Sequence, residues 1–337
     1  MLRLIGILLT IAAAIGAAIV TWPQFFRLEQ TFPIAQLVSL RPMLAIGFAG
    51  LALIGLLFCL SRRTRGFGAG IAMVAVAACV ANVAIVAVRG LGDAELPEPT
   101  ADSIRVMTWN TAGPATDVDA VVKTAIAMDV DIVALPETND DTGEAIAVAM
   151  RERGNPMWVH EENYQGWDAT YTTLLISPEL GDYAVVESES AGTSNTSIVP
   201  SVVAMPVEGD GPIVVAVHAV APRQNHMDDW RADLRWVADQ CASANVIMAG
   251  DFNATVDHMD RLGTDGGTLG RCHDAAGSTG NGGVGTWDTA WPAILGAPID
   301  HVMATDAWTA TGSVVVTSLD GSGGDHRPVI VQLEPSR

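Results

Sequence analysis

Asn245-Val246-Ile247-Met248-Ala249-Gly250-Asp251-Phe252-Asn253-Ala254 is a short apolar run that ends in a glycine, an acid and an amide. A buried strand of this kind delivers Asp251 and Asn253 to the rim of a sheet, and Gly250 lets the backbone come close to a bound group. An acid and an amide on one turn can hold a hard cation or a water molecule, and can orient a phosphate. Alone the pattern is weak, so the interpretation depends on other stretches that converge on it.

Polar side chains also stand at the ends of other apolar runs. With the first stretch included, these residues are Asn110, Glu137, His218, Asp251, Asn253, Asp300, Asp325 and His326. Each has an ordinary structural alternative, such as a turn residue, a helix cap, a satisfied buried histidine or an ion-pair partner. Their joint placement at the ends of six predicted strands favours one polar site.

The region after residue 103 has the pattern of one large α/β domain. Helices are predicted over 118–128, 141–153 and 227–242. The predicted strands are Ile104–Trp109, Asp131–Leu135, Thr170–Ile176, Ile198–Val207, Ile213–Val220, Val246–Ala249, His301–Ala304, Ser313–Ser318 and Val329–Leu333. This order fits two sheets packed face to face with helices outside.

Three uncharged apolar runs precede that region, namely Leu4–Val20, Met43–Leu60 and Gly66–Val88. A helix rises ~1.5 Å per residue and a bilayer core is ~30 Å thick, so each run with its flanks can span a membrane. A cleaved signal peptide and buried core helices are the alternatives, but three such runs favour membrane helices. We therefore expect a membrane domain over 1–90, a linker over 91–102 and a catalytic domain over 103–337.

The basic residues predict the orientation of the membrane domain. Ser61-Arg62-Arg63-Thr64-Arg65 is typical of a cytoplasmic loop, and Arg3 places the N-terminus on the same side. Arg27, Arg41 and Arg89 count mildly against this orientation because they fall on the other side. The third helix would then end on the extracytoplasmic side. We therefore expect a multi-pass protein of the plasma membrane with an extracytoplasmic catalytic domain.

The charge is unevenly divided between the two parts. Residues 1–90 hold seven arginines and one glutamate, which leaves 11 basic and 37 acidic residues, a net charge of −26, for residues 91–337. Nucleic-acid-binding proteins normally present a basic face, because phosphate contacts supply most of their affinity. The charge therefore argues against nucleic acid as a partner.

The four cysteines fall into two groups. Cys59 and Cys79 lie in the membrane runs, where packing is their expected role. Cys241 and Cys272 lie in the outer domain, where a disulfide can form. The sequence leaves a bridge and two free thiols equally open.

Two segments, Gly250-Asp251-Phe252-Asn253-Ala254 and Asp325-His326-Arg327-Pro328-Val329, resemble signatures of the endonuclease/exonuclease/phosphatase (DNase I-like) superfamily. The resemblance extends over roughly Ile104 to Leu333. It implies a four-layered α/β sandwich with two packed mixed β-sheets, here preceded by three transmembrane helices. Pro136 and Gly324 depart from the commonest family pattern, but neither departure removes a ligand.

The resemblance also implies roles for the polar residues. Its metal ligands would be Glu137, Asp325 and Asn110, with Mg²⁺ as the expected ion and Mn²⁺ as a substitute. His326 would contact the scissile phosphate, and Asp300 would fix the tautomer of that histidine. Asp251 and Asn253 would position the attacking water and the phosphate, and His218 would protonate the leaving group.

The membrane helices narrow the expected activity. The arrangement is similar to actinobacterial membrane proteins of this superfamily linked to teicoplanin resistance. This resemblance favours a phosphatase or phosphodiesterase that acts on a lipid-linked, polyprenyl pyrophosphate-like substrate or on a small phosphoester at the bilayer. A DNase-type nuclease and a non-catalytic membrane receptor are the alternatives. Three arginines could bind phosphate or form ion pairs: Arg223, Arg231 and Arg327.

Overall fold

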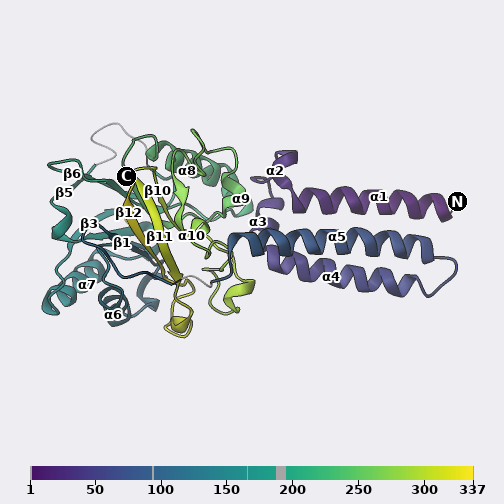
Figure 1. The fold of residues 1–337 in the computed structure, drawn as a ribbon, viewed down its shortest axis with the longest axis horizontal. Coiled ribbons are helices and arrows are strands. Elements are labelled where there is room, and N and C mark those ends of the chain that lie inside the picture. The colour runs from purple at the N-terminus through teal and green to yellow at the C-terminus, as the bar shows by residue number, and fades with distance from the viewer. Residues whose placement is uncertain (1, 93–94, 165, 187–194, 337) are drawn as a thin grey trace. The chain divides into compact units, whose positions relative to one another are not determined.

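The computed structural model describes residues 2–92, 95–164, 166–186 and 195–336. The chain divides into two compact units, Met1–Arg89 and Gly90–Arg337. Figure 1 shows the order of their helices and strands. Residues 93 and 94 of the predicted linker lie outside the described residues.

The first unit is entirely helical. It contains α1 (Leu2–Thr21), α2 (Pro23–Phe26), α3 (Ile34–Ser39), α4 (Arg41–Phe58) and α5 (Arg65–Arg89). By length and composition α1, α4 and α5 could each cross a membrane, with mean hydropathies of 2.5, 1.9 and 2.7. The three predicted apolar helices are therefore present, and the segment between the first two contains α2 and α3.

Small residues and one polar network hold these helices together. A Cβ on Gly68 would lie 2.5 Å from the carbonyl oxygen of Gly55, so α4 and α5 approach as closely as only glycine allows. The buried guanidinium of Arg41 donates to the backbone oxygen of Thr21 at 3.2 Å and to Oδ1 of Asn82 at 3.0 Å. These bonds connect α1, α4 and α5.

The second unit contains two six-stranded sheets. The strand order of the first is β11-β12-β1-β2-β4-β3, and that of the second is β5-β6-β7-β8-β10-β9. Both are mixed, because β1 runs parallel to β2 and β7 to β8 while the other pairs are antiparallel. The strands are β1 (Ile104–Thr108), β2 (Ile132–Pro136), β3 (Trp158–Asn163), β4 (Tyr171–Ile176), β5 (Tyr183–Val185), β6 (Val202–Pro206), β7 (Ile213–His218), β8 (Val246–Asp251), β9 (His273–Asp274), β10 (Asp300–Ala304), β11 (Trp308–Val315) and β12 (Val329–Pro335).

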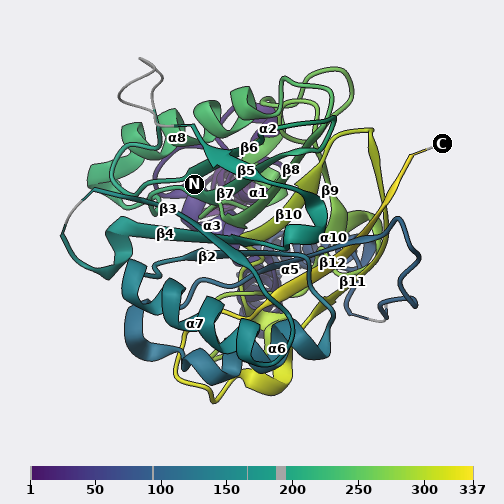
Figure 2. The same ribbon diagram turned by 90° about the vertical axis from the view of Figure 1, so that its left-hand side faces the viewer.

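Alternation along the strands builds the layers. In β2, Ile132 and Ala134 join the core between the two sheets, whereas Val133 and Leu135 join a second core under the helices. Figure 2 shows α6 and α7 on one side of the paired sheets and α8 on the other. The four-layered α/β sandwich with two packed mixed sheets is therefore confirmed.

The long helices of this unit begin where the sequence predicts them. They are α6 (Val118–Ala127), α7 (Asp140–Glu152) and α8 (Met227–Gln240), and two single turns, α9 (Val256–Met259) and α10 (Ala275–Ser278), follow. Asp117 caps α6 by accepting from the backbone N–H of Asp119, and Asn139 caps α7 through that of Thr142. Each helix ends within two residues of its predicted boundary.

The strand predictions fail at the sheet edges. β3, β5 and β9 were not predicted, and β11 was wrongly placed over Ser313–Ser318, whereas it spans Trp308–Val315. The structure puts these four strands at the four edges of the two sheets. An edge strand is covered on fewer sides and carries polar residues, so it lacks the apolar run that marks a central strand.

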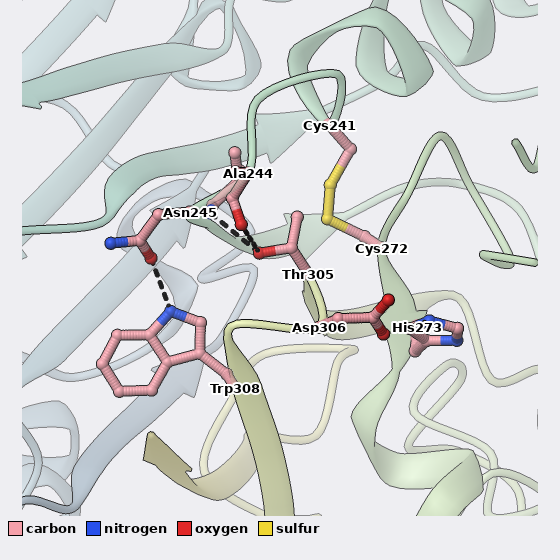
Figure 3. The surroundings of a disulfide bond; sticks show 9 residues. Cys241, Ala244, Asn245, Cys272, His273, Thr305, Asp306 and Trp308 are labelled. Atoms are coloured by element: carbon pink, nitrogen blue, oxygen red, sulfur yellow. Dashed lines mark hydrogen bonds and ion pairs between the residues drawn. A yellow bond between two sulfur atoms is a disulfide. The ribbon is translucent and has the colours of Figure 1, made fainter. Parts of the chain in front are cut away.

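Cys241 and Cys272 form a disulfide, which answers the question that the sequence left open. Both cysteines are fully buried. The bond joins the end of α8 to the segment before β9, close to where β8 begins (Figure 3). In the same region Thr305 donates to the backbone oxygen of Ala244 at 2.9 Å, which ties the end of β10 to this start of β8.

The described part of the predicted linker belongs to the second unit and packs on its sandwich. The backbone N–H of Gly92 donates to the oxygen of Gly280 at 3.2 Å, and the buried guanidinium of Arg105 donates to the oxygen of Pro97 at 2.7 Å. These bonds hold the described parts of the segment on the surface of the sandwich.

Candidate active site

Three polar residues lie side by side at one end of the second sheet. Inner-facing positions of β7 and β8 carry core residues such as Ala216 and Ala249, and two residues later the same face carries His218 and Asp251. In the register Asp251 pairs with His218 of parallel β7 and with Asp300 of antiparallel β10. The polar ends of three strands therefore cap the core between the sheets.

Gly250 makes this arrangement sterically feasible. Its backbone φ is 157°, which residues with a side chain rarely adopt. A Cβ at this position would lie 1.9 Å from the carbonyl oxygen of Val217. A side chain at this position would push β7 away from β8. The glycine of the opening stretch therefore serves the pairing that brings His218 and Asp251 together.

The first sheet contributes an amide and a carboxylate to the same site. Asn110, two residues beyond β1, donates through Nδ2 to Oε1 of Glu137 and to Oδ2 of Asp251, both at 3.1 Å. Glu137 follows β2 directly and has a left-handed backbone, with φ of 58°. Its side chain is 28% exposed, and Nε2 of His218 lies 3.9 Å from its Oε1. Asn110 thus links the carboxylates of the two sheets.

His326 lies between two carboxylates. Its Nδ1 is 2.8 Å from Oδ2 of Asp300, and its Nε2 is 3.8 Å from Oδ2 of Asp251. Because an ionised carboxylate can only accept, Nδ1 donates to Asp300. The indole of Trp109 donates to the backbone oxygen of His326 at 2.9 Å, which fixes the main chain just before β12. The ring therefore presents Nε2 towards Asp251.

Asn253 orients the Asp251 carboxylate from the loop after β8. Its backbone N–H donates to Oδ1 at 2.8 Å, and its side-chain Nδ2 donates to Oδ2 at 3.2 Å and to the oxygen of Ala219 at 2.9 Å. Asn253 has φ of 45°, a left-handed conformation that few non-glycine residues adopt. Such strain is common at functional sites, where the surrounding bonds enforce it.

Burial and charge shift the titration of these groups. Burial, together with the Asp300 carboxylate, raises the pKa of Asp251 to about 7. Burial also lowers the pKa of His218 to about 3, helped by His326. Burial alone would lower the pKa of His326, but the negative charges of Asp300 and Asp251 have the larger effect and raise this pKa to about 10. At neutral pH His218 is therefore a neutral hydrogen-bonding group rather than an imidazolium acid.

The carboxylate oxygens of this site fit a divalent cation. Ligand atoms of Asp251, Asp300 and His326 all lie within 4.8 Å of one another, and all three residues are buried. Among the described residues, Oδ1 of Asp300 is a buried atom without a hydrogen-bond partner. Crowded, partly unsatisfied carboxylates of this kind are stabilised by a hard cation.

This group differs from the predicted ligand set of Glu137, Asp325 and Asn110. Glu137 and Asn110 are joined by a hydrogen bond at the site, whereas the exposed Asp325 accepts from the indole Nε1 of Trp287 at 3.1 Å. The ligand atoms that cluster most tightly belong instead to residues with predicted roles in catalysis.

The three arginines considered for phosphate binding have different surroundings. Arg327 is fully buried and forms two hydrogen bonds of 2.7 Å to the partly exposed carboxylate of Asp320, so it is an ion-pair partner, one of the two predicted alternatives. Arg231 lies 3.4 Å from Asp228 on α8. Arg223 is exposed in the segment before α8.

Sequence reasoning assigned no role to several supporting residues, among them Thr286 and Asp274, although both resemble family positions near the site. Thr286 Oγ1 accepts from the backbone N–H groups of Ile299 and Asp300, both at 3.1 Å, and so positions the start of β10. A second buried pair joins His301 to Asp274 at 3.2 Å. The alternation of β10, which turns His301 away from Asp300, could have marked His301 as structural.

Comparisons with solved structures agree with this architecture. An endonuclease/exonuclease/phosphatase from Beutenbergia cavernae is 20% identical with a TM-score of 0.52, over 70% of this chain and 72% of that chain. A humanized D. rerio TDP2 is 15% identical with a TM-score of 0.52, over 69% and 100%. D. rerio TDP2 in complex with a single-strand DNA product is 14% identical with a TM-score of 0.51, over 69% and 99%. At these identities the likeness concerns the fold.

A search of curated proteins found no match. The model of the Endonuclease/Exonuclease/phosphatase family, however, matches residues 107–326, from β1 to the site histidine. This match covers more than half of the chain and includes each of the strand ends that build the site. The protein therefore belongs to the endonuclease/exonuclease/phosphatase family, whose members hydrolyse phosphoester bonds.

Proposed function

We propose that this protein is a membrane-anchored, metal-dependent phosphoester hydrolase that acts outside the cytoplasm on a lipid-linked or small phosphoester. The observation that carries the proposal is the buried His326, held between Asp300 and Asp251, with Asp251 bonded in turn to Asn110 of the Asn110–Glu137 pair. This constellation combines an oriented imidazole with carboxylates that can bind a cation. Both accelerate the hydrolysis of a phosphoester at neutral pH.

His326 would contact the scissile phosphate. Its Nδ1–H is held by Asp300, so Nε2 is the ring atom that remains for the substrate. The Asp300 carboxylate fixes this tautomer and stabilises positive charge on the ring. Asp300 is thus a positioning residue for the histidine.

Asp251 and Asn253 would position the attacking water. Amide groups of Asn110 and Asn253 hold Oδ2 of Asp251 at 3.1 and 3.2 Å, and the backbone N–H of Asn253 holds Oδ1. A carboxylate fixed from three sides can accept a proton from water in a defined direction. The neutral His218 beside Glu137 would contribute a hydrogen bond to the leaving-group side.

Glu137, with Asn110 and Asp325, would hold the divalent cation. When bound, Mg²⁺ or Mn²⁺ neutralises phosphate charge and stabilises the pentavalent transition state. The close group of Asp251, Asp300 and His326 is the competing position for the ion. A Mg²⁺ titration separates the two, because only substitution of a ligand raises the concentration needed for half-maximal activity.

Charge and the apolar helices support a substrate at the membrane. The net charge of −26 over residues 91–337 repels long polyanions, which disfavours DNA. Three helices that could span a membrane precede the catalytic unit in the chain. A phosphoester carried on a polyprenyl pyrophosphate-like lipid would be presented at the same surface.

The disulfide supports an extracytoplasmic location. Cys241 and Cys272 are fully buried and bridged, and such bonds persist in oxidising compartments. A fusion of alkaline phosphatase to the C-terminus tests the location, since it is active only outside the cytoplasm. A fluorescent, phosphatase-negative green fluorescent fusion would place the site inside and remove the argument for an extracytoplasmic lipid carrier.

The activity is tested with the full-length protein in detergent and Mg²⁺ on a substrate panel. The panel contains bis-p-nitrophenyl phosphate, p-nitrophenyl phosphate, a polyprenyl pyrophosphate, sphingomyelin and plasmid DNA. We expect hydrolysis of a small or lipid-linked phosphoester, lost in Glu137→Gln and His326→Ala. Rapid EDTA-sensitive cleavage of plasmid at low enzyme would instead identify a nuclease, and a panel without any turnover would favour a receptor.

A further inference from the structure

The membrane unit contains a cavity of about 520 Å³ between α1 and the start of α5, together with the loop before it. One part of its lining is basic and the rest is apolar or small. The lining residues are Arg3, Gly6, Ile7, Thr10, Ile11, Arg62, Arg63, Arg65, Gly66, Phe67 and Gly70.

Close helix packing forms the apolar wall. A Cβ on Gly6 would lie 3.4 Å from Cβ of Phe67, and a Cβ on Gly70 would lie 2.9 Å from the methyl group of Thr10. The Thr10 hydroxyl donates to the backbone oxygen of Gly6 at 2.9 Å, so it is satisfied within its own helix. The wall therefore suits a hydrocarbon chain better than a polar solute.

Positive charge gathers at one end of the cavity without a carboxylate to neutralise it. Arg3, Arg62, Arg63 and Arg65 are all exposed, and no guanidinium among these four forms an ion pair with any residue that the structure describes. Glu29 is the single acid in residues 1–90, and it is buried. The arginines are thus free to bind an external anion.

We propose that this cavity binds an anionic phospholipid, with the phosphate on the arginines and an acyl chain along the wall. Guanidinium groups bind phosphate through paired, charge-assisted hydrogen bonds. From Arg3 to Ile11 the wall follows α1 over nine residues, eight rises of ~1.5 Å or ~12 Å, which accommodates the upper part of a chain. A zwitterionic lipid would bring its ammonium towards the arginines and bind more weakly.

The test is native mass spectrometry of the full-length protein in detergent with phosphatidylglycerol or phosphatidylcholine. We expect retention of phosphatidylglycerol, weakened about tenfold by Arg62→Gln, which removes one charge-assisted contact. Arg27→Gln is the matched control, because Arg27 is also exposed but does not line the cavity. It should leave retention within about twofold of the wild type.

A second pair of variants tests the shape of the site without changing its charge. A Cβ on Gly66 or on Gly16 would meet no atom within 4 Å, so a side chain can leave the backbone at either position, but only Gly66 lines the cavity. Gly66→Leu should therefore displace the lipid, and Gly16→Leu should not. Equal losses in Arg62→Gln and Arg27→Gln, unchanged binding in Gly66→Leu, equal retention of the two lipids, or displacement by inorganic phosphate would each overturn the proposal.

Discussion

Replacing Asp300 by asparagine removes the carboxylate that accepts from Nδ1 of His326 at 2.8 Å but keeps the size of the side chain. Asparagine lacks the negative charge that raises the pKa of His326, and its amide can donate to Nδ1, so the neutral ring would carry its proton on Nε2. The residue is buried on β10 opposite Asp251, so water cannot substitute for the lost partner.

The size of the effect follows from the kind of bond that is lost. A hydrogen bond to a charged group contributes about 1.5–3 kcal/mol, and a buried group left with the wrong partner costs about 1–3 kcal/mol more. If about 3–4 kcal/mol of this total raises the activation free energy, kcat falls about 100- to 1,000-fold. KM should change less than about threefold, because Asp300 acts through His326 rather than on the substrate.

The assay is hydrolysis of bis-p-nitrophenyl phosphate by the full-length protein at saturating Mg²⁺. Asp274→Asn is the matched control, since Asp274 forms the second buried pair, with His301 at 3.2 Å, outside the proposed machinery. This variant should lose stability but keep kcat within about threefold of the wild type.

Two results would refute this reasoning. The first is a kcat of Asp300→Asn within about threefold of the wild type, which would mean that the histidine needs no orientation. The second is recovery of Asp300→Asn by excess Mg²⁺, because Asp300 would then be a ligand of the cation rather than the partner of His326.

Three further predictions concern the scaffold, each measured as the free energy of unfolding in urea. Gly250→Ala should destabilise by about 3 kcal/mol, because the added Cβ would lie 1.9 Å from the oxygen of Val217; a loss below about 0.5 kcal/mol would contradict the close strand approach. Arg327→Met should cost about 3–5 kcal/mol by removing the bonds to Asp320, and an unchanged stability with a raised KM would instead restore its phosphate-binding role. Cys241→Ser with Cys272→Ser should cost about 2–4 kcal/mol for a bridge across 31 residues, and equal stability with and without reductant would count against the bond.

The central strands and the polar site could be predicted because both leave local marks in the sequence. Apolar runs such as Val246–Ala249 identify strands buried on both faces, and polar residues at their ends identify the rim of the sheet. Asp251 and His218 could therefore be assigned to one site before their register was known. The predicted helices agree with the structure to within two residues, and Asp117, which caps α6, is a local signal of the kind that marks where a helix begins.

The edge strands could not be predicted because their own sequences carry no clear strand pattern. They are strands because they form hydrogen bonds with a neighbouring strand. Trp158–Asn163 contains His160, Glu161 and Glu162, and it pairs with β4 on one side alone. β5 and β9 have three and two residues, too few to show a period. Their existence depends on long-range pairing.

Contacts between segments far apart in the sequence could not be predicted either. Asn110 bonds to Asp251 across 141 positions of sequence, and this bond brings the two sheets together at the site. The sequence left Arg327 open to phosphate or to an ion pair, and it could not show that the partner is Asp320 or that the guanidinium is buried. Neither of these two contacts can be predicted from the residues next to it in the sequence.

The metal dependence of phosphoester hydrolysis tests the central claim most directly. The measurement is hydrolysis of bis-p-nitrophenyl phosphate by full-length wild-type protein and by Glu137→Gln, after EDTA treatment and across a Mg²⁺ titration. We predict that EDTA abolishes activity and that Mg²⁺ restores it in the wild type, whereas Glu137→Gln stays at least about 100-fold lower. Activity that survives EDTA, or a Glu137→Gln variant as active as the wild type, would contradict the account.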